Sequence, residues 1–171
     1  IQGGEVTGTI DESIRHAVTK LSHIHFPSTK DAAERIIKMG ENPSMVHAVG
    51  CPYLDIILNS KFSTKSALAE KYQLDLDKKL IIFTQHAVTT EYGESSDQIK
   101  ITLEVSKEIK NCQILAFYSN TDAGGKIILN NLKRQDNFKL IPNMQSLDFL
   151  SLMKYADMMI GNSSAAIREA P

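Results

Sequence analysis

The sequence predicts an α/β fold in which helices cover both faces of a parallel sheet. Short apolar runs alternate with helix-periodic segments along most of the chain, and the links between them are short. The run at 80–83 is continuously apolar, which is typical of a strand buried on both faces. Strands and helices that alternate in this way form parallel sheets with helices on each side.

The chain up to residue 72 contains one well-marked helix start. Thr9 and Glu12 have the spacing of a capping box, and apolar residues then recur at helical intervals, so a helix is expected at 11–22. Pro27 should stop the strand that follows, and Gly40 should end the next helix. The elements expected after the first helix are a strand at 23–26, a helix up to residue 40, a strand at 46–50, and helices at 53–58 and 66–72.

The remainder of the chain repeats the order of strand and helix. A polar turn at 77–79 precedes the apolar strand at 80–83. The elements expected after it are helices at 96–109, 126–132, 147–155 and from about 163, which alternate with strands at 113–118, 138–141 and 158–160.

Composition excludes several classes of protein. The chain has 171 residues and a formal charge of -1, so nothing favours binding to nucleic acid or to an acidic membrane surface. Its apolar runs are far shorter than a membrane span, and no secretory signal opens it. Cys51 and Cys112 form no CxxC pair, which suits a reducing compartment. We therefore expect a soluble, cytoplasmic protein.

Two histidines are candidates for a metal site. His23 and His25 share one face of an expected strand, but no third ligand lies at a recognisable spacing. A packed strand is the favoured interpretation, and we expect neither a metal nor a cofactor.

Three loops follow strands at the carboxyl edge of the predicted sheet, where ligands of such folds bind. They are 84–90, 119–125 and 161–164. In the first, His86 directly follows a strand end, and a functional role and an ordinary surface position are about equally supported. We expect the residues of all three loops to converge on one rim.

The loop at 161–164 has features that suit a diphosphate. Its glycine, asparagine and two serines would supply free N–H groups and hydroxyls at the start of a helix. Glu169, one to two turns into that helix, could point toward a ribose diol. The alternative is that Asn162 or Ser163 only caps the helix.

The opening segment is a second place where chemistry could occur. Its glycines, within residues 3–8, allow the backbone to approach a ligand closely or to turn sharply. Carboxylates follow at Glu5, Asp11 and Glu12. The alternative is that Asp11 and Glu12 only interact with the helix dipole, and both interpretations stay open.

Five stretches carry a resemblance to a known family. They are IQGGEVTGTIDESIRHAVTKLSHIHF at 1–26, GCPYLD at 50–55, TQHAVTTEYG at 84–93, SNTDAGG at 119–125 and GNSSAAIREAP at 161–171. Taken together, they resemble the UDP-N-acetylglucosamine 2-epimerase family, and specifically its hydrolysing branch.

The resemblance implies a two-domain fold like that of the GT-B glycosyltransferases, with the active site between two Rossmann-like domains. Residues 1–45 would be the end of the first domain, and 46–171 most of the second, UDP-binding one. The family eliminates UDP to give a 2-acetamidoglucal and then adds water to yield N-acetylmannosamine, a step toward sialic-acid-like sugars. We expect a fragment that is inactive alone, from a full-length protein that forms a homo-oligomer, a dimer or tetramer.

The resemblance also assigns roles to individual residues. Asp11 matches a catalytic acid/base carboxylate, and His86 matches a histidine that contacts the diphosphate and is needed for activity. The positions that match nucleotide-binding residues are Asn120, Phe149 near the uracil, Ser163 and Ser164 at the phosphates, and Glu169 on the ribose hydroxyls.

One catalytic position departs from the family pattern. Gln2 stands where many members have a catalytic Glu, and an amide has no proton to exchange near neutral pH. Another carboxylate such as Glu5 could take the role, the substrate or activity could differ, or the residue could have been changed to stall turnover. The competing functions are a nucleotide-sugar binding module without turnover and a GT-B glycosyltransferase.

Overall fold

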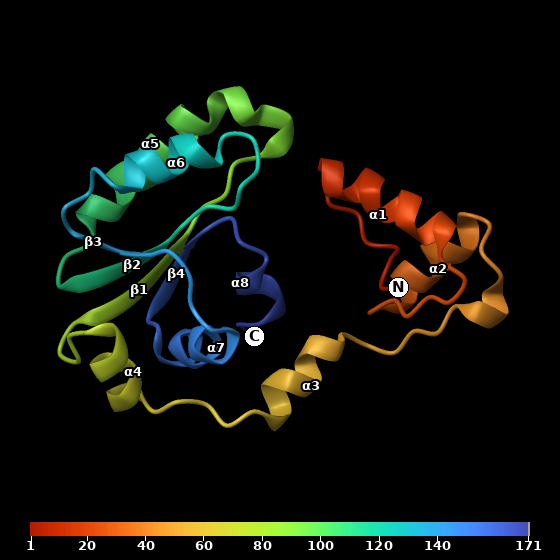
Figure 1. Cartoon of the computed structure of the whole chain (residues 1–171), viewed down its shortest axis with the longest axis horizontal. Coiled ribbons are helices and arrows are strands. Elements are labelled where there is room, and N and C mark those ends of the chain that lie inside the picture. The colour runs from red at the N-terminus through yellow and green to blue at the C-terminus, as the bar shows by residue number, and fades with distance from the viewer. Residues whose placement is uncertain (171) are drawn as a thin grey trace. The chain divides into compact units, whose positions relative to one another are not determined.

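The computed structural model describes residues 1–170, apart from the side chain of Tyr92. The chain separates into two compact units, Ile1–Asn59 and Ser60–Pro171 (Figure 1). The expected assignment of 1–45 and 46–171 to two domains of a longer protein stays a prediction. In the described part of the chain, no helix has the length and apolar character needed to cross a membrane.

The second unit is built on a parallel sheet of four strands. The strands are β1 (Lys79–Thr84), β2 (Cys112–Phe117), β3 (Phe138–Ile141) and β4 (Met158–Gly161). Their order across the sheet is β3-β2-β1-β4, and every neighbouring pair is parallel. The alternation of strands and helices therefore predicted the architecture correctly, and β1 lies inside the sheet, as its continuous apolar run indicated.

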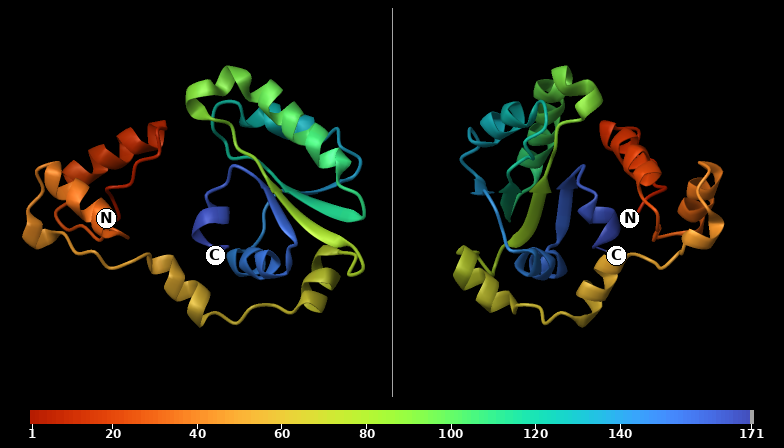
Figure 2. Two further views of the ribbon diagram at one scale, coloured as in Figure 1. Left: turned by 180° about the vertical axis from the view of Figure 1, so that it is seen from behind. Right: turned by 45° about the vertical axis from the view of Figure 1, so that its right-hand side comes forward.

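Helices cover both faces of this sheet. They are α4 (Lys65–Tyr72), α5 (Ser95–Glu108), α6 (Gly125–Leu132), α7 (Ser146–Tyr155) and the short α8 (Ala165–Arg168), with a 3-10 segment at Thr89–Glu94. Figures 1 and 2 show α5 and α6 on one face and α7 with α4 on the other.

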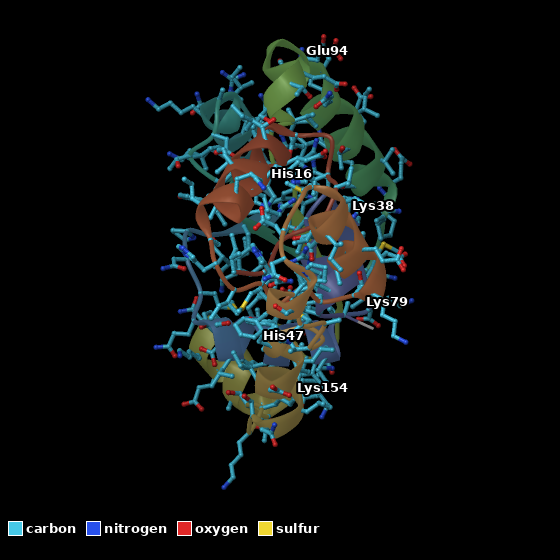
Figure 3. All side chains as sticks on the ribbon, turned by 90° about the vertical axis from the view of Figure 1, so that its right-hand side faces the viewer. His16, Lys38, His47, Lys79, Glu94 and Lys154 are labelled. Atoms are coloured by element: carbon cyan, nitrogen blue, oxygen red, sulfur yellow. The ribbon has the colours of Figure 1, made fainter. Side chains whose placement is uncertain are left out.

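The strand β1 contributes to the hydrophobic core on each side. Ile81 and Phe83 pack toward α5 and α6, whereas Leu80 and Ile82 pack toward α4 and α7. Phe83 and Ile82 are completely buried, and a buried side chain of this size contributes about 1.5–3 kcal/mol. The charged side chains of Lys79 and Glu94 lie exposed on the outside of the unit (Figure 3).

The first unit is helical, with extended links. Its elements are α1 (Ile10–Leu21), α2 (Lys30–Lys38), a 3-10 turn at Pro43–Met45 and α3 (Pro52–Asn59). The helix α2 begins with a capped turn, because the Thr29 side chain accepts from the N–H of Ala32 at 3.1 Å.

The strands predicted at 23–26 and 46–50 do not form as regular strands. They are reduced to one parallel bridge, His25 with Val46, in which the His25 N–H donates to Met45 O at 2.9 Å and the His47 N–H donates to His25 O at 2.9 Å. The next rung would need an N–H at residue 27, and Pro27 has none. The ladder is therefore interrupted after one bridge.

Candidate functional site

The carboxyl ends of β1 and β4 meet closely in the second unit. Thr84 pairs with Gly161 in the register of the sheet, and the Asn162 N–H donates to Thr84 O at 3.1 Å. Gly161 has a φ of 133°, and a Cβ there would lie only 1.8 Å from Thr84 O. A glycine is therefore required where the loop at 161–164 leaves the sheet.

The side chain of Asn162 binds the backbone of His86 at two points. The His86 N–H donates to Asn162 Oδ1 at 2.8 Å, and Asn162 Nδ2 donates to His86 O at 2.9 Å. The interpretation of Asn162 as a helix cap is therefore wrong, because both groups of its amide are engaged elsewhere. Ser163 makes the local contact instead, since its Oγ accepts from the Ala165 N–H at 3.3 Å.

The imidazole of His86 is half-buried and contacts the next loop. The backbone N–H of Asn120 donates to His86 Nδ1 at 3.4 Å. Burial lowers the pKa of His86 below its ordinary value of 6.5, and the negative charge of Asp122 opposes that shift. The ring is therefore neutral near pH 7, and because Nδ1 accepts, the remaining proton belongs on Nε2.

Two glycines shape the loop at 119–125 around Asn120. Gly124 has a φ of 90°, and a Cβ on Gly125 would lie 2.3 Å from Asn120 O. The Asn120 side chain donates to Asp122, so the exposed loop is also held by its own polar groups. This tight turn positions the Asn120 N–H beside the histidine.

Phe149 and Glu169 lie on elements that follow β3 and β4. Phe149, in α7, is half-buried and packs edge-to-face on Phe117 with ring centroids 5.1 Å apart. Glu169 directly follows α8 and continues its turn, because its N–H donates to Ala165 O at 3.0 Å.

A buried carboxylate beside Phe149 was missed by the sequence analysis. Asp148 accepts from Lys71 Nζ at 2.7 Å and from Tyr72 OH at 2.7 Å, and the Ser63 hydroxyl donates to it at 3.3 Å. The hydrogen bond from Lys71 and then that from Tyr72 hold the pKa of Asp148 below its ordinary value. In the sequence it has only the appearance of an acidic residue near a helix start, so no local signal distinguished it.

Gln2 and Asp11, the two catalytic candidates of the first unit, have different surroundings. Gln2 Nε2 donates to Glu5 Oε1 at 3.2 Å and also to Ser28 Oγ. Asp11 lies exposed in the first turn of α1. The contact of Gln2 with a neighbouring carboxylate could not be read from the spacing alone.

Glu12 has a structural role in the same segment. Its Oε2 accepts from the N–H groups of Thr7 and Gly8 at 2.8 and 2.7 Å, and these bonds lower the pKa of its carboxyl group. Thr9 caps nothing with its side chain, and Glu12 binds the N–H groups that precede Thr9 and not the N–H of Thr9 itself, so the predicted capping box does not form.

The histidines considered for a metal site are separated by burial. His25 is completely buried and its Nε2 lies 3.3 Å from Glu41 Oε2, whereas His23 is exposed. Among the residues that the structure describes, no three His, Cys, Asp or Glu side chains are grouped so that they could hold a metal ion.

The fold and the candidate site define a Rossmann-like α/β protein, with polar loops gathered at the carboxyl edge of a parallel sheet. A family model described as UDP-N-acetylglucosamine 2-epimerase matches residues 1–171. The chain therefore belongs to the UDP-N-acetylglucosamine 2-epimerase family.

Several curated proteins are similar to the chain. A UDP-N-acetylglucosamine 2-epimerase of Neisseria meningitidis serogroup B is 38% identical over 100% of this chain and 45% of its own length. A GDP/UDP-N,N'-diacetylbacillosamine 2-epimerase (hydrolyzing) of Campylobacter jejuni is 38% identical over 99% of this chain and 46% of its own length. The chain thus spans about half the length of these relatives.

A solved structure is similar in fold. The crystal structure of UDP-GlcNAc 2-epimerase from Neisseria meningitidis bound to UDP-GlcNAc matches with a TM-score of 0.79 and 22% identity, over 100% of this chain and 49% of that one. The α/β fold of this chain therefore corresponds to half of the GT-B-like epimerase fold.

Proposed function

We propose that the full-length protein is a hydrolysing UDP-N-acetylglucosamine 2-epimerase, which converts UDP-N-acetylglucosamine to UDP and N-acetylmannosamine. Family membership supports the general reaction. The observation that carries the proposal is the arrangement of His86, Asn120 and Asn162, because it holds an imidazole with an occupied Nδ1 at the carboxyl edge of the sheet, where such folds bind phosphates.

In this proposal, His86 stabilises the departing diphosphate. With Nδ1 accepting from Asn120, the Nε2–H group is free to donate to a phosphate oxygen as charge develops on it when the C–O bond breaks. Ser163 and Ser164 contact the phosphates, Glu169 the ribose hydroxyls and Phe149 the uracil.

Asp11 is the proposed acid/base carboxylate for the C2 proton and for the addition of water. Gln2 cannot exchange a proton, but its amide donates to Glu5, and this contact favours Glu5 as the second carboxylate of the site. The released N-acetylmannosamine would serve sialic acid synthesis. One 34% identical relative, from Escherichia coli, is named polysialic acid biosynthesis protein P7.

The test is turnover by the full-length protein. Incubation with UDP-N-acetylglucosamine and, separately, with UDP-N,N'-diacetylbacillosamine is expected to release UDP, with the 2-epimer of the free sugar seen by NMR. The second sugar is included because hydrolysing relatives named for it are 38% and 34% identical to the chain. Asp11→Asn should reduce the rate about 100-fold or more, whereas Asp136→Asn, at an exposed position, should not. No UDP release from either sugar contradicts the proposal.

A nucleotide-sugar binding module without turnover is the second candidate, and Gln2 is the observation that favours it. The variant Gln2→Glu separates the two. If the natural protein binds UDP-sugar without turnover and the glutamate variant becomes active, the binding module is supported. A natural protein that is already active excludes it.

A further inference from the structure

In the loop at 161–164, the side-chain amide of Asn162 binds His86 with both its oxygen and its nitrogen. We propose that Asn162 is the positioning residue of His86, holding it at a defined place relative to the serine turn at 163–164. The inference rests on the proposed function for its catalytic consequence. The structural part of the inference, that Asn162 sets the place of the imidazole, rests only on the hydrogen bonds between the Asn162 amide and the His86 backbone.

The need for such a residue follows from where the sheet ends. The ladder between β1 and β2 stops at Phe83 with Ala116, and that between β1 and β4 stops at Thr84 with Gly161. His86 therefore lies beyond the last ladder pair on both sides of β1. Its backbone N–H and C=O are bound instead by the amide of Asn162, at 2.8 and 2.9 Å.

The chemistry of the contact is specific to an asparagine side chain. A primary amide offers a donor and an acceptor side by side, so it can bind both polar groups of one peptide residue. A carboxylate would keep the acceptor but lose the donor, and an alanine would lose both. The backbone N–H of Asn162 adds a third bond, to Thr84 O at 3.1 Å, so the amide is itself firmly placed.

The side-chain hydrogen bonds of Asn162 connect His86 to the serine turn, and both are proposed to act on one diphosphate. Asn162 directly precedes Ser163 and Ser164 in the chain, and its side chain binds His86. The N–H of Asn120, in the loop that follows β2, donates to the imidazole at 3.4 Å from Nδ1. The distance between the Nε2–H donor and the serine turn is therefore set by Asn162, and positioning of this kind affects the rate more than ground-state binding.

The experiment compares Asn162→Ala and Asn162→Asp in the full-length protein, with Asn130→Ala on the exposed surface of α6 as the control. For Asn162→Ala we expect kcat to fall about 10- to 100-fold while the Kd for UDP changes less than about threefold. Asn162→Asp keeps one of the two bonds and should show a smaller loss, and the control should match the natural protein.

The second readout does not depend on turnover. In long-range proton–nitrogen NMR spectra of the UDP-free protein, Asn162→Ala should move the ring resonances of His86 and populate both imidazole tautomers. The inference is overturned if a folded Asn162→Ala protein has the kcat of the natural protein and unchanged His86 ring resonances. If Asn162→Ala fails to fold, the same comparison with Asn162→Asp decides it. Absence of UDP release by the natural protein refutes the proposed function instead. The NMR result still tests whether Asn162 positions His86.

Discussion

At the scale of single residues, the environment determines which polar side chains can do chemistry. His25 forms an isolated bridge with Val46 and is completely buried against Glu41, whereas His86 follows β1 and is half-buried at the sheet edge. The N–H of Asn120 occupies one ring nitrogen of His86 and leaves the other for a ligand. This difference makes His86 the better candidate for binding an anion.

The protonation of His86 provides a prediction at this scale. Its pKa should lie below 6.5 because burial disfavours the imidazolium. The unfolded chain binds more protons than the native one between the native pKa and 6.5, so stability falls as the pH drops through that window. The loss is complete below the native pKa and absent well above 6.5. A pH titration of the His86 ring by NMR should give a midpoint below 6.5 and a proton on Nε2 at pH 7. A midpoint above 6.5 would contradict the prediction.

At the scale of elements, the buried carboxylate of Asp148 joins α7 to α4. Its hydrogen bond to Lys71 raises the pKa of that lysine, and burial together with the bond to Asp148 raises the pKa of Tyr72. The next residue along α7 is Phe149, which packs on Phe117. The network therefore fixes the helix that carries the proposed uracil contact.

Replacement of Asp148 tests this network. Asp148→Asn should reduce the free energy of unfolding by about 1–2 kcal/mol, since it removes a charged hydrogen bond whose Lys71 partner is partly exposed. The native contribution is complete above the unfolded pKa of about 3.8 and is lost as pH falls through the lower native pKa, so the variant should lose less stability in acid. Urea unfolding at pH 7 and pH 3 measures both effects, with Asp136→Asn as the control. Equal stability of the two variants at pH 7 would exclude the role.

At the scale of the whole molecule, the two units are unequal in how they bury apolar surface. The sheet of the second unit has a core on both faces. In the first unit, Ile10 and Leu21 of α1 are 56% and 81% exposed, although their helical spacing is typical of a packed face. The chain spans about half the length of its curated relatives, and its proposed UDP contacts lie in the second unit.

We therefore predict that the 171-residue chain alone binds UDP but has no epimerase activity. The proposed nucleotide contacts lie in this chain, but it spans only about half the length of its relatives, and half of a site cannot position both ends of the sugar. UDP at 100 times its Kd should stabilise the chain by about 2.7 kcal/mol, seen as a raised thermal midpoint. An unchanged midpoint in millimolar UDP, or measurable epimerisation by this chain, would each contradict the prediction.

Much of the second unit could be predicted from the sequence because its signals are local. The strand at 80–83 was evident from its continuous apolar run and the glycine loop at 119–125 from its composition. The strands at 23–26 and 46–50 were not predicted correctly, since their pairing depended on the N–H that Pro27 lacks.

The sequence by itself determined the α/β class, the order of elements in the second unit and membership of the UDP-N-acetylglucosamine 2-epimerase family. Only the tertiary structure decided what the polar side chains do. Asn162 could cap a helix or bind another loop, and Gln2 could stand alone or hold Glu5. The physical reason is that hydrophobic periodicity is a property of neighbouring residues, whereas an amide pairs with whichever groups the fold brings within about 3 Å.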